Sequence, residues 1–279
     1  MKQFLIMALL WVVSSLGTSA QVINTLFFAY PQWSEELEER AKTDFPAKVV
    51  VGYYYLEGKG VKQNARTAVM WFKDAISQQH DDIGRAYNNL AYCYEHGMGT
   101  EKDVTKAFEN YLLAAKNGDN NSYCNLAECY ELGKGTTQNF DEALKWYSKC
   151  IENGTPEGKR KSQVRTGYIL AFEKHDVQGG VPFLETAGKN GSAAAYYYLG
   201  EIYNHGIGDV DIDYSKALSY FKQSINTDQI LPFVVTIIAD FYYEGKGTAQ
   251  NKEKAKELYQ TALKRGDLDA EKKLNELSF

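Results

Sequence analysis

The sequence predicts an all-α protein built from about six stacked pairs of antiparallel helices. Two observations carry this prediction. Pairs of glycines two residues apart recur along the chain, and each pair lies between two segments with helical apolar spacing. The first glycines of these pairs are residues 58, 97, 133, 206 and 245, so the intervals are 39, 36, 73 and 39. A period in this range is typical of helical repeat arrays. Because 73 is about twice the period, an altered sixth unit is expected at residues 155–191.

The segment before each glycine pair is the first helix of a unit, called helix A below. In the second unit Leu90 and Tyr94 stand four residues apart, so they share one face of the helix. Ala91 lies between them and is small enough to let a neighbouring helix approach closely. The other units repeat this pattern with Leu126 and Tyr130, Leu199 and Tyr203, and Ile238 and Tyr242.

The segment after each glycine pair is the second helix, called helix B. It begins with an Asn or Asp four residues before an alanine, and these two residue types are favoured N-caps. An aromatic pair, such as Trp71-Phe72 or Trp146-Tyr147, follows three residues after the alanine. The predicted N-caps are Asn64, Asp103, Asn139, Asp213 and Asn251, with Asp176 in the altered unit.

The glycine pairs themselves raise the question of phosphate binding, because Gly-Lys-Gly occurs three times. A phosphate-binding P-loop needs Gly-Lys followed by Ser or Thr, after a strand. Here the position between the glycines is Lys59, Lys134 or Lys246 in three units but Met98 and Ile207 in the other two. A turn between helices with positive φ explains the glycines, and it requires no lysine.

These spacings resemble those of the Sel-one-like repeat family, a relative of the tetratricopeptide repeats. Its pattern is A-x-x-x-L-G-x-x-Y-x-x-G-x-G, followed by a capping Asp or Asn, Lys-Ala, an aromatic pair and A-x-x-G. The resemblance covers residues 47–268, with residues 155–191 as a degenerate unit. It implies a right-handed α/α superhelical solenoid that serves as an interaction scaffold.

The two ends of the chain fit no complete unit. Residues 1–20 have a positive start and an unbroken apolar stretch, Phe4–Val13, too short for a membrane span of about 20 residues. This pattern predicts a cleaved signal peptide, with a membrane anchor as the alternative. We therefore expect an exported protein, periplasmic or secreted. Residues 21–46 are interpreted as an N-terminal arm and a capping helix beginning after Ser34, and residues 269–279 as a C-terminal capping helix.

Composition and motifs argue against several function classes. The net charge of −5 and the pI of about 5.5, without clustered Lys and Arg, argue against a nucleic-acid partner. Neither a serine-nucleophile motif nor a zinc-hydrolase motif occurs. We therefore expect no catalytic residue and no cofactor. We also expect no metal site, because the four histidines share no ligand spacing; they are His80, His96, His175 and His205.

The four cysteines divide into two kinds. Cys124 begins helix A of the third unit and Cys150 ends its helix B, so an antiparallel pair would bring them together. A cysteine-rich secreted branch of the family staples its units similarly, but each cysteine here is shifted by one residue, and the bridge stays open at this point. Cys93 and Cys129 occupy equivalent positions in successive helices and are expected to be buried free thiols.

In solenoids of this family helix A lines the concave face, which is therefore the predicted binding surface. An acidic and aromatic groove would favour a basic or apolar peptide. The expected function is that of a non-enzymatic scaffold for a protein or peptide. The alternatives are a β-lactam-binding or hydrolysing member of the cysteine-rich branch, and a structural element of the envelope. The predicted surface residues are Tyr53, Asn88, Tyr92, Glu128, Tyr197, Glu201, Asp240 and Tyr243.

Overall fold

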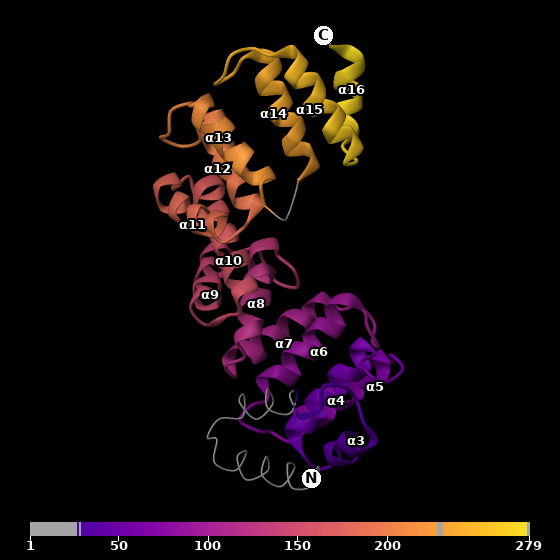
Figure 1. The fold of residues 1–279 in the computed structure, drawn as a ribbon. Helices are drawn as coiled ribbons and strands as arrows, with labels where there is room; N and C mark the ends of the chain where they lie inside the picture. Colours follow the sequence, from indigo (N-terminus) through magenta and orange to yellow (C-terminus); the bar gives the residue numbers. More distant parts are fainter. Residues whose placement is uncertain (1–26, 28, 228–230, 278–279) are drawn as a thin grey trace. The chain divides into compact units, whose positions relative to one another are not determined.

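A computed structural model describes residues 27, 29–227 and 231–277, and every regular element in these ranges is helical (Figure 1). The chain divides into two compact units, residues 1–150 and 151–279, which are described separately. The predicted signal peptide, residues 1–20, and most of the N-terminal arm lie outside the described residues. The all-α fold of stacked helix pairs is confirmed.

Unit 1 contains a short capping helix and three helix pairs. The capping helix α3 is Glu35–Ala41, and the Ser34 hydroxyl accepts from the Leu37 N–H, as an N-cap should. In the pairs, even numbers are helices A and odd numbers are helices B: α4 (Phe45–Glu57), α5 (Ala65–Ser77), α6 (Gly84–His96), α7 (Val104–Lys116), α8 (Asn120–Leu132) and α9 (Phe140–Asn153), with the unit boundary in the last turn of α9.

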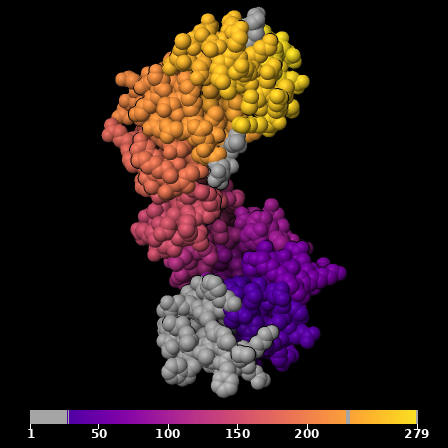
Figure 2. Space-filling model, in the orientation of Figure 1, coloured from indigo at the N-terminus to yellow at the C-terminus, as the bar shows by residue number. Residues whose placement is uncertain are grey.

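Unit 2 contains the altered pair, two regular pairs and a final helix. Each repeat packs against its neighbours in the chain. In Figure 2, where colour follows residue number, this unit therefore changes gradually toward yellow. Its elements are α10 (Pro156–Tyr168), the π-helix η1 (Ile169–Glu173), α11 (Val177–Lys189), α12 (Ala193–His205), α13 (Tyr214–Ile225), α14 (Pro232–Glu244), α15 (Lys252–Lys264) and α16 (Leu268–Glu276).

The predicted N-caps of helices B are confirmed. Asn64 accepts from the Thr67 N–H at 3.2 Å, and Asn139 accepts from the N–H groups of Asp141 and Glu142. The side chains of Asp103, Asp176, Asp213 and Asn251 likewise each accept from the N–H three residues later. Each cap satisfies backbone donors that the first helical turn would otherwise leave unpaired.

The glycine pairs fulfil two different structural requirements. The first glycine ends helix A in the left-handed region, for example Gly133 with φ +65°. The second, Gly135 with φ +70°, lies directly against the start of the preceding helix B: a Cβ there would stand 2.0 Å from the carbonyl oxygen of Val104. Gly99 meets Ala65 and Gly247 meets Tyr214 in the same way. The glycine turn is therefore also the contact between consecutive repeats.

Within a pair, a small residue of helix A receives a large side chain from helix B. A Cβ on Gly52 would lie 2.5 Å from the Phe72 ring, and one on Gly200 would lie 2.4 Å from the Phe221 ring. In the altered unit Gly167 meets Leu184 at 2.6 Å. Phe72, Phe221 and Leu184 are completely buried, so these contacts form the core of each pair.

The altered unit replaces the glycine turn with a different ending of helix A. The chain passes from α10 into the π-helix η1, and His175 takes the left-handed conformation, with φ +58°. The Asp176 N–H donates to the Leu170 carbonyl at 2.8 Å, and Asp176 then caps α11. Helix B keeps its expected start although the turn is shorter, as the spacing of Asp176 predicts.

The N-terminal arm takes the place that a preceding helix B occupies elsewhere. The Trp33 N–H donates to the Lys59 carbonyl at 3.1 Å, and a Cβ on Gly60 would stand 3.0 Å from the Trp33 nitrogen. The Tyr54 hydroxyl donates to the carbonyl of Tyr30. The arm thus covers the exposed side of the first repeat.

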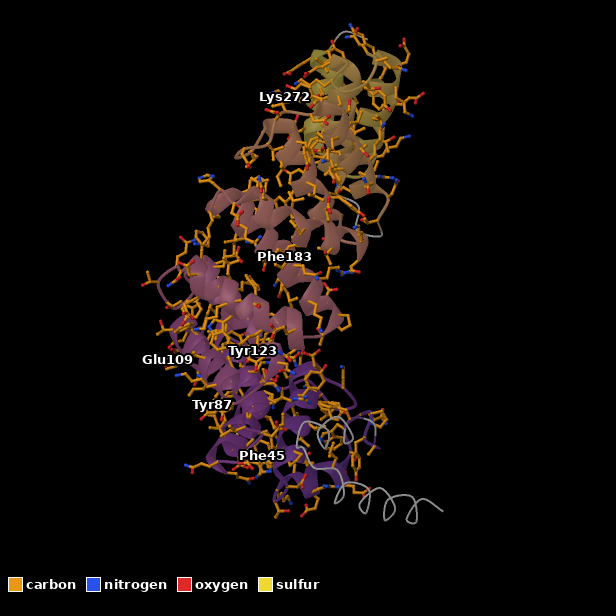
Figure 3. All side chains as sticks on the ribbon, turned by 90° about the vertical axis from the view of Figure 1, so that its left-hand side faces the viewer. Phe45, Tyr87, Glu109, Tyr123, Phe183 and Lys272 are labelled. Carbon is orange, nitrogen blue, oxygen red and sulfur yellow. A yellow bond between two sulfur atoms is a disulfide. The ribbon has the colours of Figure 1, made fainter. Side chains whose placement is uncertain are left out.

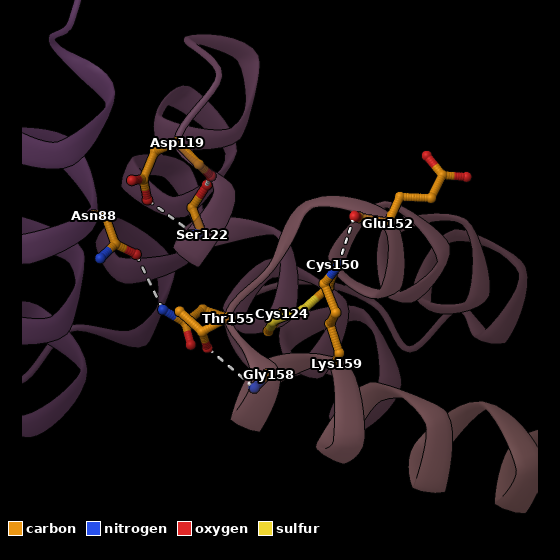
Figure 4. Close-up of a disulfide and its surroundings, with 10 residues drawn as sticks. Asn88, Asp119, Ser122, Cys124, Cys150, Glu152, Thr155, Gly158 and Lys159 are labelled. Atoms are coloured by element: carbon orange, nitrogen blue, oxygen red, sulfur yellow. Dashed lines mark hydrogen bonds between the residues drawn. A yellow bond between two sulfur atoms is a disulfide. The ribbon is translucent and has the colours of Figure 1, made fainter. Parts of the chain in front are cut away.

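In the structure Cys124 and Cys150 form a disulfide that joins α8 to α9, with a Cα–Cα distance of 5.5 Å (Figure 4). Cys93 and Cys129 are free and buried, as expected. Burial raises the pKa of each of these two thiols to about 12, so both remain protonated near neutral pH.

Replacing Gly135 with alanine is expected to destabilise unit 1 more than replacing Gly118. Both have φ near +70°, but a Cβ on Gly118 meets nothing within 4 Å, so Gly118→Ala carries only the backbone cost of about 1 kcal/mol. Gly135→Ala adds the clash with Val104 and should cost about 1–3 kcal/mol more. Urea unfolding followed by tryptophan fluorescence measures this, because all four tryptophans lie before residue 151. Equal losses for the two variants would contradict the contact.

The cysteine assignment predicts the outcome of alkylation. Protein purified without reductant should incorporate no label when folded, two labels when denatured and four when denatured and reduced, as counted by mass spectrometry. Reduction should also lower the unfolding free energy by about 3 kcal/mol, since the bridge closes a loop of 26 residues. Four labels on denatured, unreduced protein would contradict the bridge.

Candidate binding surface

The predicted surface residues divide equally between the two units. Tyr53, Asn88, Tyr92 and Glu128 belong to unit 1, whereas Tyr197, Glu201, Asp240 and Tyr243 belong to unit 2. All eight are partly or largely exposed, and all lie on helices A. The exposed face of helices A that carries these residues is called below the helix-A surface of each unit.

Tyr168 occupies the same helix-A position and is not among the predicted surface residues. Tyr168 directly follows the small residue Gly167, as Tyr53 follows Gly52 and Tyr92 follows Ala91. It is half-buried and its ring stacks on Phe172 of the π-helix, with centroids 5.2 Å apart. Gly167 was the available signal, because the surface residue of the other units directly follows the small residue of helix A.

In unit 1 the helix-A surface contains a pocket of about 490 Å³. Tyr53 and Asn88 line it, but Tyr92 and Glu128 do not. Phe27 of the arm forms part of the wall, and its ring meets that of Tyr53 edge to face at 5.4 Å. The remaining polar lining residues come from the glycine turn of the first repeat and from α6 and α8, and they are Lys59, Arg85, Asn89 and Asn121.

Side-chain amides connect consecutive helices A at this pocket. The Asn125 Nδ2 of α8 donates to the Asn88 Oδ1 of α6 at 3.0 Å. Figure 3 labels Tyr87 of α6 and Tyr123 of α8, which occupy equivalent sequence positions in these two consecutive repeats. Asn88, which lines the pocket, is therefore held by an amide of the next repeat.

Lysines of the glycine turns contact the surface. Lys134 Nζ lies 2.7 Å from Glu128 Oε1 and 3.2 Å from Glu95 Oε1, which places it between two consecutive helices A. Lys59 Nζ donates to the Tyr53 hydroxyl at 2.8 Å. Glu128, which was predicted to face a ligand, is thus paired with Lys134 of the protein itself.

Other carboxylates of helices A are drawn toward helix B. The Tyr111 hydroxyl donates to Glu95 at 2.9 Å, and the Tyr147 hydroxyl donates to Glu131 at 2.6 Å. Burial together with the nearby carboxylate raises the pKa of Tyr111, which keeps its hydroxyl protonated as a donor. These pairs link the two helices of a repeat through a hydrogen bond to a charged group, which is stronger than a neutral one.

In unit 2 the predicted acidic residues are also engaged. Asp240 accepts from the Tyr259 hydroxyl and pairs with Lys273 at 2.8 Å. Glu201 lies 3.6 Å from His205 Nε2, and burial raises the pKa of its carboxyl. Burial, with Glu201 nearby, also raises the pKa of Tyr197 to about 12. Phe233, Tyr243 and Tyr197 give this surface a mainly aromatic character.

Neither a metal centre nor a membrane span is found in the part of the chain that the structure describes. No group of three His, Cys, Asp or Glu side chains there could hold a metal ion. No helix there is both long enough and apolar enough to cross a bilayer.

Asp119 lies beneath this surface in unit 1 and caps α8, where its carboxylate accepts from the Ser122 N–H at 2.9 Å (Figure 4). Burial raises the pKa of its carboxyl to about 6, although Arg85 opposes the shift. A raised carboxyl pKa means that the charged form is disfavoured in the folded state. The stability linked to Asp119 is therefore complete below about pH 4 and is lost as the pH rises through 6.

Replacing Asp119 with asparagine, which keeps a capping oxygen, should raise the unfolding free energy at pH 7.5 by about 1–3 kcal/mol and have little effect at pH 4. The matched control is Asp103→Asn on the exposed cap of α7, where the hydrogen bond from Lys106 lowers the pKa. Its effect should have the opposite sign, a loss at neutral pH that disappears in acid. Urea titrations at several pH values measure both, and a pH-independent Asp119→Asn effect would contradict the assignment.

The chain matches the family model described as Sel1 repeat in five segments that cover more than half of its length: residues 47–80, 84–119, 121–155, 193–226 and 238–267. The altered unit falls in the gap between the third and fourth segments. Protein sel-1 homolog 2 of Homo sapiens and of Mus musculus are each 39% identical over 70 residues, or 25% of this chain. The match spans only 10% of the length of these relatives.

Two solved structures share the fold. The protein c5321, a protective antigen of uropathogenic Escherichia coli with an SLR fold, gives a TM-score of 0.66 at 26% identity and covers 82% of this chain and 48% of its own. A Sel1 repeat protein from Oxalobacter formigenes gives 0.61 at 24% identity and covers 80% and 88%. Together with the five matched segments, these likenesses agree with the glycine turns and caps described above, and the protein belongs to the Sel1-repeat family.

Proposed function

We propose that this protein is a non-enzymatic scaffold that binds another protein or a peptide through its helix-A surfaces. The observation that carries the proposal is the pocket of unit 1, which is lined by side chains from three successive repeats together with the N-terminal arm. A pocket of about 490 Å³ has the size of a ligand site. Sel1 repeats generally mediate protein interactions, which supports this use of the surface.

The proposal includes export to the periplasm or the cell exterior. The apolar stretch within residues 1–20 supports it, and so does the disulfide between Cys124 and Cys150, because disulfides persist in oxidising compartments. The alternative of β-lactam binding or hydrolysis gains no specific observation from the described residues. Turnover of the chromogenic β-lactam nitrocefin, abolished by a single point mutation, would overturn the non-enzymatic proposal.

The expected partner contact can be tested by chemical crosslinking in the native host followed by mass spectrometry. Tyr53→Ala combined with Tyr92→Ala should reduce partner crosslinks at least about tenfold, because truncating aromatic contacts at the centre of an interface typically costs more than 1 kcal/mol each.

The control replaces two exposed apolar side chains of helices B, Met70 and Leu113, with alanine. This control should leave the crosslinks intact. If the tyrosine variant also leaves every crosslink unchanged, the helix-A surface of unit 1 is not the binding surface.

A further inference from the structure

The pocket of unit 1 has a chemical character that the sequence did not predict. We propose that it binds an extended peptide segment and holds an aspartate or glutamate side chain of that segment near Lys59 and Arg85. This inference rests on the proposed scaffold function and specifies its partner. It replaces the basic or apolar peptide that the sequence favours.

The charges of the lining carry the first step. Lys59 and Arg85 line the pocket, and none of the described residues that line it is an aspartate or glutamate. The hydrogen bond from Lys59 Nζ goes to the Tyr53 hydroxyl, a neutral acceptor, so this contact does not cancel the lysine charge. Arg85 interacts with Asp119, a buried carboxyl that is not among the lining residues and meets part of the arginine charge. Lys59 therefore supplies most of the positive charge that makes the wall of the pocket complementary to a negative group.

Glu128, the carboxylate expected to make this surface acidic in unit 1, and its neighbour Glu95 both have partners within the protein. Glu128 pairs with Lys134, and Glu95 accepts from both Lys134 and Tyr111. Neither carboxylate lines the pocket. A count of charges along the helix-A sequence thus overstates the negative character of the surface that a ligand meets.

The amides of the lining favour a peptide over a small anion. Asn88, Asn89 and Asn121 line the pocket, and a primary amide offers both donors and an acceptor. The amide hydrogen bond from Asn125 occupies the Asn88 oxygen and leaves its donors for a ligand. The backbone of an extended peptide likewise offers N–H donors and C=O acceptors. These amides can therefore pair with the backbone whatever the peptide sequence is.

The spread of the lining residues sets the extent of the ligand. They come from α4 and its turn, from α6 and from α8, which are three successive helices A. Packed helices lie about 8–10 Å apart, and an extended chain advances about 3.3 Å per residue, so about three residues correspond to each repeat. A single amino acid would reach only part of the lining. Phe27, Pro31 and Tyr53 add an apolar wall for a neighbouring side chain.

The test measures fluorescence anisotropy of labelled hexapeptides with the full chain. The first probe alternates Val and Glu and has a blocked C-terminus, and the second and third carry Lys or Gln in place of Glu. The Glu probe should bind most tightly, the neutral Gln probe measurably but more weakly through the backbone contacts alone, and the Lys probe most weakly. The affinity of the Glu probe should fall about three- to tenfold with Lys59→Gln, as expected for a partly exposed ion pair. It should fall again in 0.5 M salt, where exposed charges are screened.

The matched control is Lys73→Gln, an exposed lysine on helix B of the same repeat, which should leave the affinity unchanged. Asn89→Ala should weaken the Glu and Gln probes by the same factor, because it removes a backbone contact. Unchanged tryptophan fluorescence establishes that each variant is folded.

Three outcomes would overturn this proposal. They are equal or tighter binding of the Lys probe, binding that needs a free C-terminal carboxylate, and binding insensitive to Lys59→Gln. If no probe binds but host crosslinks still depend on Tyr53 and Tyr92, the acidic-peptide inference fails and the scaffold function stands. If the crosslinks are also insensitive to those tyrosines, the proposed function fails with it.

Discussion

The contact between the second glycine of each turn and the first turn of the preceding helix B is the constraint on which the rest of the structure depends. At Gly135 the space for a Cβ is already occupied by the Val104 carbonyl, and Gly99 and Gly247 are equally close to the backbone of the preceding repeat. This approach brings each helix pair onto its neighbour, and a solenoid is stable only because neighbouring repeats bury each other's apolar faces. Side chains on successive helices A, such as Asn88 and Asn125, meet as a result.

Inside each helix pair two different solutions fill the same space. Where helix B supplies Phe72 or Phe221, helix A has a glycine, and the ring packs directly on the backbone. Where helix B supplies Tyr111 or Tyr147, helix A has an alanine and a carboxylate that accepts the tyrosine hydroxyl. A buried hydroxyl left without a partner would be costly, so the tyrosine and its acceptor occur together. Carboxylates that could face a ligand therefore serve the interior.

The altered unit shows what happens when the glycine turn is absent. The chain ends helix A with a π-helix and places His175 in the left-handed region, a conformation that residues other than glycine adopt at a cost. Stacking continues, because Gly208 of the following turn still approaches Val177 of this unit. A Cβ on Gly208 would lie 2.7 Å from Val177 Cγ2. The π-helix brings Phe172 against Tyr168 and Tyr198, and the helix-A surface of unit 2 gains an aromatic cluster as a consequence.

The sequence by itself determined the helix pairs, their caps and the glycine turns, because these depend on residues close together in the chain. The N-caps at Asn64 and Asn139, the capping helix after Ser34 and the register of the altered unit at Asp176 are local features of this kind. The family resemblance followed from the same spacings, since five copies repeat them.

Only the tertiary structure decided the chemistry of the surface. Lys134 pairs with both Glu128 and Glu95, which lie on two consecutive helices A, and Tyr259 and Lys273 engage Asp240 from two other helices. The arm residue Phe27 meets Tyr53 to form one wall of the pocket, although no periodicity connects them. Charges and walls of this kind depend on which side chains meet across different helices, and a sequence pattern gives the face of a residue but not its partner.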